Sequence, residues 1–188
     1  MTTFIGTSMD DVFIGTSMDD VITGFAGNDN FEGRSGDDRI QGGNGNDRIK
    51  GGNGDDILRG GQGDDILRGG KGDDLLVGGR DNDQLFGGLG ADKFEFGMEF
   101  GNDIVGDFNF AEGDSIILKG DLLESVFGIS FGGDIEIDNP FGFFVLGLAL
   151  NNDSNENTSA FIQNNDVIFD FGGNNTITFQ GLLNGSVA

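Results

Sequence analysis

Large apolar residues recur at every ninth position through the first half of the chain, from Phe13 to Phe94. Each is preceded by an Asp two residues earlier and by a Gly seven residues earlier. Starting at Gly6, the chain therefore divides without a gap into ten nonapeptides, the last of which ends at Glu95. Place one of the unit is always Gly, place six is always Asp and place eight is always apolar. A period kept this strictly predicts a solenoid in which successive units stack on one another.

Within each unit, the three residues around the apolar position are expected to form a short strand. The six preceding residues are rich in Gly and are expected to turn the chain back through positive φ angles, which other residues avoid. The ninth unit has Asp81 instead of Gly at place four, and the first two units have Thr at place two and Met at place four, so the turn is less favoured there. Units with Gly at places one, two and four begin at Gly42, Gly51, Gly60, Gly69 and Gly87.

The second half of the chain lacks this period. Alternating runs at 92–96, 114–120, 133–138, 166–171 and 175–183 predict strands, and residues 121–128 could hold one helical turn. Thirteen of the 19 Phe residues lie between Phe96 and Phe179. Because a solenoid must cover its last sheet edge, we expect an array over residues 1–95 followed by a Phe-rich β cap over 96–188. An exposed patch at 138–147, able to pair subunits, is the alternative use of the apolar residues there.

The amino-acid composition favours hard cations, which bind oxygen atoms, as the ligands of this chain. The net charge is −23, from 33 acidic and 10 basic residues, which disfavours nucleic acids and anionic membranes as partners. Residues 1–95 carry 19 acidic and 9 basic side chains, a net charge of −10. The chain has no His and no Cys, which excludes thiolate and imidazole ligands and leaves only oxygen atoms to bind a metal.

The repeated phrase G-G-x-G-x-D-x-U-x, where U is apolar, resembles the calcium-binding nonapeptide of RTX proteins. This resemblance implies an all-β fold, a right-handed parallel β-roll with two nonapeptides per turn. Residues 90–118 and 166–182 are similar to the segment that follows the repeats in serralysin-type proteases and in the repeat modules of alginate epimerases. That similarity implies that the roll continues into a β-rich, Phe-rich capping region.

The resemblance also implies the ligands, because in this family each calcium ion lies between loop n and loop n+2. One loop supplies the carbonyls of places two and four and its Asp, and the other supplies the carbonyls of places one and three and its Asp. Ten loops paired in this way allow at most eight sites, so about five to eight Ca²⁺ ions are expected. Asp11 and Asp20, in the first two loops, are weaker candidates. The candidate carboxylate ligands are Asp29, Asp38, Asp47, Asp56, Asp65, Asp74, Asp83 and Asp92. The candidate carbonyl ligands are those of Gly27, Gly36, Gly42, Gly43, Asn44, Gly45, Gly51, Gly52, Asn53, Gly54, Gly60, Gly61, Gln62, Gly63, Gly69, Gly70, Lys71, Gly72, Gly78, Arg80, Gly87 and Leu89.

The array is not expected to fold without metal. Burying one Leu or Ile yields about 1.5–3 kcal/mol, whereas ordering nine residues costs about 1–2 kcal/mol for each backbone unit. Each repeat is therefore in deficit, and repulsion between carboxylates on neighbouring turns adds to that deficit. Calcium binding must then supply much of the folding free energy.

The resemblance implies a secreted, non-catalytic calcium-binding protein or module, exported by a type I (ABC) secretion system that reads an uncleaved C-terminal signal, here near 182–188. The N-terminus lacks the features of a cleavable signal peptide, and the longest apolar run, 141–150, is too short to span a membrane. An enzyme is disfavoured because the repeats begin at residue 6 and because a zinc protease would need His residues. The alternative is a carbohydrate-binding or self-assembling module outside the cell or on its surface.

Overall fold

The computed structural model describes residues 1–120, 134–139, 158–163, 166–172 and 174–180. Every element described in these ranges is a β-strand, as expected for an all-β fold. The strands are β1 Thr2–Ile5, β2 Val12–Ile14, β3 Asp20–Ala26, β4 Asn30–Ser35, β5 Arg39–Asn44, β6 Arg48–Asn53, β7 Ile57–Gln62, β8 Ile66–Lys71, β9 Leu75–Arg80, β10 Gln84–Leu89, β11 Lys93–Phe96, β12 Asn102–Val105, β13 Ser115–Leu118, β14 Ile135–Ile137, β15 Ser159–Gln163, β16 Asp166–Asp170 and β17 Thr176–Phe179.

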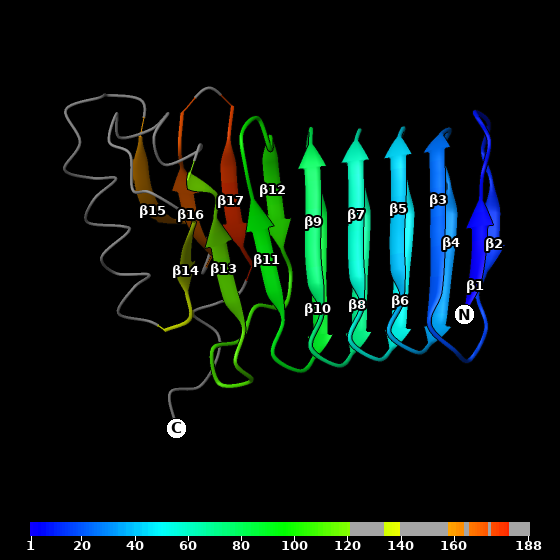
Figure 1. Cartoon of the computed structure of the whole chain (residues 1–188). Coiled ribbons are helices and arrows are strands. Elements are labelled where there is room, and N and C mark those ends of the chain that lie inside the picture. Colours follow the sequence, from blue (N-terminus) through cyan, green and yellow to red (C-terminus); the bar gives the residue numbers. More distant parts are fainter. Residues whose placement is uncertain (121–133, 140–157, 164–165, 173, 181–188) are drawn as a thin grey trace.

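Successive repeats alternate between two facing parallel sheets (Figure 1). One sheet, here called sheet A, has the order β1-β3-β5-β7-β9-β11-β13-β14, and the other, sheet B, has the order β15-β16-β17-β12-β10-β8-β6-β4-β2. Each strand pairs with the strand two repeats later, so that Leu58 lies beside Leu76 in sheet A and Ile49 beside Leu67 in sheet B. Two nonapeptides therefore complete one turn, which confirms the predicted parallel β-roll.

The strands are longer than the three residues expected from the repeat. A typical strand such as β5 or β7 has six residues, because pairing continues through places one to three of the following unit. Gly43 thus pairs with Gly61, and Asn44 with Gln62. The prediction of a six-residue loop was wrong, because the Gly residue at place two keeps the backbone within pairing distance of the next turn. Only places four to six remain as the turn itself.

The core is a column of place-eight side chains between the two sheets. Leu58, Leu67 and Leu76 are fully buried, and the same place is filled by Ile or Phe in other turns. At the N-terminal end of the stack, Phe13 is only half-buried, and its ring stacks on Phe4 with a centroid distance of 3.8 Å. A single apolar side chain per repeat is therefore enough to fill the narrow space between the sheets.

Beyond the tenth repeat both sheets continue into the predicted Phe-rich cap. Strands β13 and β17 extend the parallel pairing, after which β14 and β16 pair antiparallel to them. Aromatic side chains fill this end in edge-to-face pairs, such as Phe100 with Phe171 and Phe108 with Phe179. The proposed domain boundary at residue 95 falls inside β11, so hydrogen bonding runs through it without a break.

Several features predicted from the sequence lie outside the described residues. These are the helical turn at 121–128, most of the apolar run at 138–147 and the proposed secretion signal at 182–188. Within the described part of the chain, no helix is long and apolar enough to cross a membrane.

The place-eight column should carry most of the packing energy. We expect Leu67→Ala to lower the free energy of unfolding of the calcium-loaded protein by about 2–5 kcal/mol, because it leaves a cavity between two close sheets. Leu89→Ala is the matched control, since Leu89 is 59% exposed, and should change stability by less than about 0.5 kcal/mol. Chemical denaturation would measure both, and equal losses in the two variants would contradict this packing scheme.

Candidate metal sites

The place-six aspartates form two ladders, one along each edge of the roll where the chain passes between the sheets. In each ladder the Oδ1 atom of one Asp accepts a hydrogen bond from the backbone N–H of the Asp two loops earlier. The distances run from 2.7 Å, for Asp47 N–H to Asp65, to 3.0 Å, for Asp92 N–H to Asp114. The first edge carries Asp11, Asp29, Asp47, Asp65 and Asp83, and the second edge carries Asp20, Asp38, Asp56, Asp74 and Asp92.

The second carboxylate oxygen of these residues is the unusual feature of the fold. In nine aspartates of the described chain, Oδ2 is buried and has no hydrogen-bond partner: Asp29, Asp38, Asp47, Asp56, Asp65, Asp74, Asp83, Asp92 and Asp103. Burying a polar or charged group without a partner is costly. A regular row of such atoms along each edge therefore indicates positions where a cation supplies the missing partner.

The pKa values of the aspartates in these rows also indicate positions for a cation. Burial raises the pKa of Asp65 and of Asp74 to about 8, and the carboxylates of neighbouring turns push it in the same direction. For the same reasons the pKa of Asp56 rises to about 7 and that of Asp103 to about 9. Without a cation, the folded roll thus favours protonation of these carboxyl groups.

Backbone carbonyls face the space between stacked loops. A Cβ atom on Gly61 would collide with the carbonyl oxygen of Gly43, so the place-two carbonyl of one loop points to the loop two units later. In the opposite direction, a Cβ on Gly60 would lie 2.6 Å from the carbonyl oxygen of Gly78. Carbonyls from places two and one therefore approach each gap from its two sides.

Places three and four follow the same scheme. A Cβ on Gly45 would meet the carbonyl oxygen of Gly27, so the place-four carbonyl also points to the later loop. The place-three carbonyl points back, because Gln62 accepts a hydrogen bond of 2.7 Å from the N–H of Gly45. The carbonyls of Asn44, Asn53, Lys71 and Leu89 accept equivalent bonds.

The third to tenth loops share one turn geometry, with left-handed φ angles at places two and four. Gly occupies most of these positions, as at Gly61 (φ 132°) and Gly63 (φ 114°). Phe25, Arg34 and Asp81 adopt the same left-handed conformation despite their side chains, with φ of 82°, 83° and 78°. Asp81 therefore keeps the left-handed turn, but its Oδ2 accepts the N–H of Gly63 at 3.0 Å, a bond that the place-three carbonyl accepts in other loops.

The first two loops are built differently. In the first, the Asp11 carboxylate accepts hydrogen bonds from the N–H and the hydroxyl of Thr7, at 2.6 and 3.0 Å. In the second, Asp20 accepts the same pair of bonds from Thr16, at 2.7 and 2.9 Å. These bonds give both carboxylates local partners, and they help to lower the pKa of Asp20 despite its burial. Threonine thus provides in these loops the partner that the later loops lack.

The oxygen set fits calcium. Ca²⁺ takes six to eight oxygen ligands at about 2.3–2.6 Å, and backbone carbonyls serve as well as carboxylates. No group of three or more acidic side chains converges on one point among the described residues, so carboxylates alone do not complete a site. Two carboxylates and four carbonyls from adjacent turns would provide six oxygens.

Asp103 was missed by the sequence analysis. Its Oδ1 accepts the N–H of Asp83 at 2.9 Å, so it adds a further step to the first-edge ladder. Its spacing from Asp83 is 20 residues instead of 18, which places it outside the nine-residue register. The signal that could have found it is Gly101-Asn102-Asp103, the same three residues as Gly45-Asn46-Asp47 in the fifth loop.

The place-five residues are exposed and form their own ladder. The N–H of Asp64 donates to Asn46 Oδ1 at 3.1 Å, and the N–H of Asn82 donates to Asp64 Oδ1 at 3.0 Å. These side chains therefore cap the turns from outside, whereas the neighbouring Asp65 is buried.

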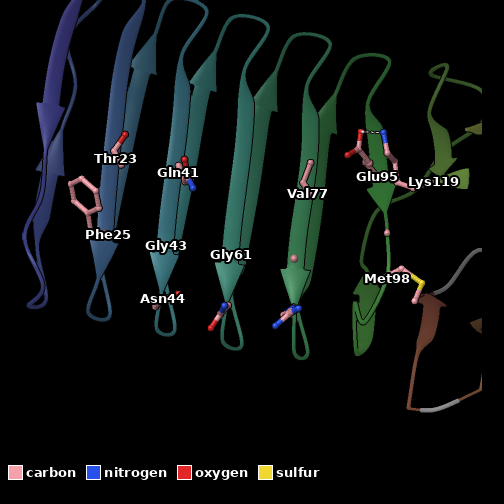
Figure 2. Close-up of a pocket in the computed structure, with 14 residues that line it drawn as sticks. Thr23, Phe25, Gln41, Gly43, Asn44, Gly61, Val77, Glu95, Met98 and Lys119 are labelled. Carbon is pink, nitrogen blue, oxygen red and sulfur yellow. Dashed lines mark ion pairs between the residues drawn. The ribbon is translucent and has the colours of Figure 1, made fainter. Parts of the chain in front are cut away.

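Sheet A also bears an open groove of about 580 Å³ on its outer face (Figure 2). Its floor includes glycines such as Gly61, and Phe25 and Met98 contribute exposed apolar side chains. Lys119 lies 3.9 Å from Glu95 along the groove. No place-six Asp lines the groove, but Gly43, Asn44, Gly61 and Gln62, whose carbonyls are candidate ligands, do.

The comparisons with known proteins agree with this geometry. The family model for the RTX calcium-binding nonapeptide repeat, a unit of four copies, matches residues 5–40, 32–67 and 59–94. Residues 5–94 of this chain therefore match the RTX calcium-binding nonapeptide repeat.

The chain was also compared with solved structures and with curated proteins. The fold is similar to a crystal structure of the extracellular lipase LipA from Serratia marcescens, with a TM-score of 0.39 and 18% identity. That match covers 97% of this chain but 38% of the lipase chain, so this chain spans well under half of the lipase. A comparison with curated proteins gave no match.

The raised pKa values predict an unusual pH dependence of the metal-free protein. In the unfolded chain the pKa of an Asp is about 3.8, but in the folded roll the pKa of Asp65 and of Asp74 is about 8. Between these values the folded state binds more protons than the unfolded state, so stability falls as the pH rises. Metal-stripped protein should show more β-structure by circular dichroism at pH 5 than at pH 8. A gain of β-structure from pH 5 to pH 8 without metal would contradict the prediction.

Proposed function

We propose that the protein is a secreted, non-catalytic calcium-binding module whose folding depends on Ca²⁺ held between stacked loops. The observation that carries this proposal is the two rows of buried, unpartnered Oδ2 atoms at the edges of the roll. A divalent cation between loops that are stacked on the same edge would give these atoms a partner and remove the repulsion between neighbouring carboxylates.

Each ion would lie between loop n and loop n+2. For the fifth and seventh loops, the ligands would be the carbonyls of Gly43 and Gly45 with Asp47, and the carbonyls of Gly60 and Gln62 with Asp65. The third to tenth loops form six such pairs, three along each edge. The pairs that include the first two loops are weaker sites, because Thr7 and Thr16 already satisfy their carboxylates. The six pairs and the two weaker ones would hold six to eight ions along the repeats, within the five to eight expected from the sequence.

The secreted location follows from the same energetics. Sites of weak to moderate affinity fill at the millimolar calcium concentrations outside cells and stay largely empty in the cytosol. A chain that stays unfolded until it meets calcium suits export through a type I secretion system. The strong acidity of the chain also supports calcium as its partner, and disfavours nucleic acids.

A carbohydrate-binding role is the second candidate. The groove on sheet A combines the exposed ring of Phe25 with the amides of Gln41, Asn44 and Gln62, a mixture that suits a polar, neutral chain such as a polysaccharide. Among the described residues that line the groove, however, Phe25 is the single aromatic one. The calcium proposal therefore has the stronger support.

A calcium titration of metal-stripped protein, followed by far-UV circular dichroism at pH 8, tests the main proposal. We expect a cooperative gain of β-structure with Ca²⁺ but not with Mg²⁺, which requires octahedral geometry and retains its water. Asp65→Asn should raise the calcium midpoint several-fold, because Asp65 is a ligand in two adjacent sites. Asp64→Asn is the matched control on the exposed side of the same turn, and its midpoint should stay within about twofold of the wild type. A spectrum that is fully β without metal, or equal shifts in both variants, would refute the proposal.

A further inference from the structure

The turn at residues 98–103, Met-Glu-Phe-Gly-Asn-Asp, lies beyond the ten sequence repeats and beyond the residues that the family model matches. Its backbone nevertheless has the geometry of a calcium-binding loop. Glu99 has a φ of 58° and Gly101 a φ of 85°, so both are left-handed. They lie four and two residues before Asp103, the same offsets as places two and four from place six.

At places four to six, the contacts of this turn with the ninth loop repeat those between regular loops, whereas the pairing of β11 with β9 is confined to Lys93 with Leu75 and Phe94 with Leu76. A Cβ atom on Gly101 would collide with the carbonyl oxygen of Asp81, just as a place-four Cβ does elsewhere along the first edge. The N–H of Asn102 donates to Asn82 Oδ1 at 3.1 Å and continues the place-five ladder. The N–H of Asp83 donates to Asp103 Oδ1 at 2.9 Å and continues the place-six ladder.

The burial of the Asp103 side chain indicates a bound ligand, as it does for the aspartates of the repeats. The residue is 1% exposed, and its Oδ2 atom is buried without a hydrogen-bond partner. An ion pair of 3.0 Å between Arg80 of the ninth loop and Glu99 holds the two turns together from outside. This turn therefore has a buried carboxylate oxygen without a hydrogen-bond partner. The ninth loop lies beside it, with the N–H of Asp83 2.9 Å from Asp103 Oδ1.

We propose that residues 98–103 form an eleventh calcium-binding loop, which holds a Ca²⁺ ion together with the ninth loop. The ninth loop would supply the carbonyls of Gly79 and Asp81 with Asp83, and the new loop would supply the carbonyls of Met98 and Phe100 with Asp103. The inference rests on the proposed calcium-dependent function and extends it into the cap. Calcium then stabilises the junction between the repeats and the cap as well as the repeats themselves.

The equivalent position on the second edge has a different structure. Asp114 Oδ1 accepts the N–H of Asp92 at 3.0 Å, but its Oδ2 accepts a hydrogen bond of 2.8 Å from the N–H of Asn109. Both oxygens of Asp114 therefore have partners within the protein, as do both oxygens of Asp20 in the second loop. The proposal thus adds one site on the first edge and none on the second.

The test is a count of bound ions by native mass spectrometry at saturating Ca²⁺, on the full chain. Asp103→Asn should bind one ion fewer than the wild type, since Asn can still accept the N–H of Asp83 but supplies no charge. Asp114→Asn, the matched control at the other ladder end, should bind the wild-type number. Circular dichroism with calcium would establish that both variants fold.

The other outcomes distinguish a failure of the eleventh loop from a failure of the proposed function. An unchanged count in Asp103→Asn, or the loss of one ion in both variants, would overturn the eleventh loop while leaving the ten repeats as calcium sites. A wild-type protein that binds no calcium would instead overturn the proposed function itself. If Asp103→Asn does not fold, an anomalous difference map of calcium-loaded wild-type crystals decides: a peak between the carboxylates of Asp83 and Asp103 supports the eleventh loop, and its absence overturns it.

Discussion

The structure depends on carboxylates that are buried next to one another at the spacing of a parallel sheet. Strands about 4.8 Å apart bring the Asp of each loop close to the Asp two loops later. From the third loop to the tenth, one oxygen of each place-six carboxylate, such as Asp65 Oδ1, accepts a hydrogen bond from the backbone of its neighbour, while the other has no partner among the described residues. The same packing that fills the core with Leu67 therefore creates a row of buried oxygen atoms that a bound cation or protonation of the carboxyl groups would stabilise.

This constraint explains how the ladders end. At the N-terminal end, the hydroxyls and N–H groups of Thr7 and Thr16 hold the first carboxylates, so these turns close within the chain. At the other end of the second edge, the N–H of Asn109 holds Asp114. The first edge instead continues to Asp103, whose free oxygen resembles those of the repeats. Three of the four ladder ends thus have local donors, whereas the aspartates of the interior each keep one oxygen without a hydrogen-bond partner in the described part of the chain.

The nine-residue period predicted a stacked solenoid with one apolar core residue per repeat, because the same residues recur in register over ten units. The parallel β-roll with two repeats per turn was instead implied by the resemblance to RTX proteins. Strand length was harder to predict, since the pairing of Gly43 with Gly61 depends on the stacked neighbour and not on the local sequence. The left-handed conformations of Phe25, Arg34 and Asp81 follow from the turns above and below them, which override the preference for Gly. Asp103 was not predicted because a two-residue insertion shifts it out of the nine-residue period. In the structure its side chain nevertheless accepts the N–H of Asp83, as in the rest of the ladder.

The central claim is that calcium, and not the apolar core alone, holds the roll together. Small-angle X-ray scattering of the metal-stripped protein at pH 8, before and after calcium is added, tests it most directly. For 188 residues, a compact chain has a radius of gyration of about 16 Å and an unfolded chain about 46 Å. We predict an expanded chain without metal, and on addition of calcium a collapse to a value near the compact limit and slightly above it, because the roll is elongated. A radius that is already near the compact limit without calcium, and unchanged by it, would contradict the account.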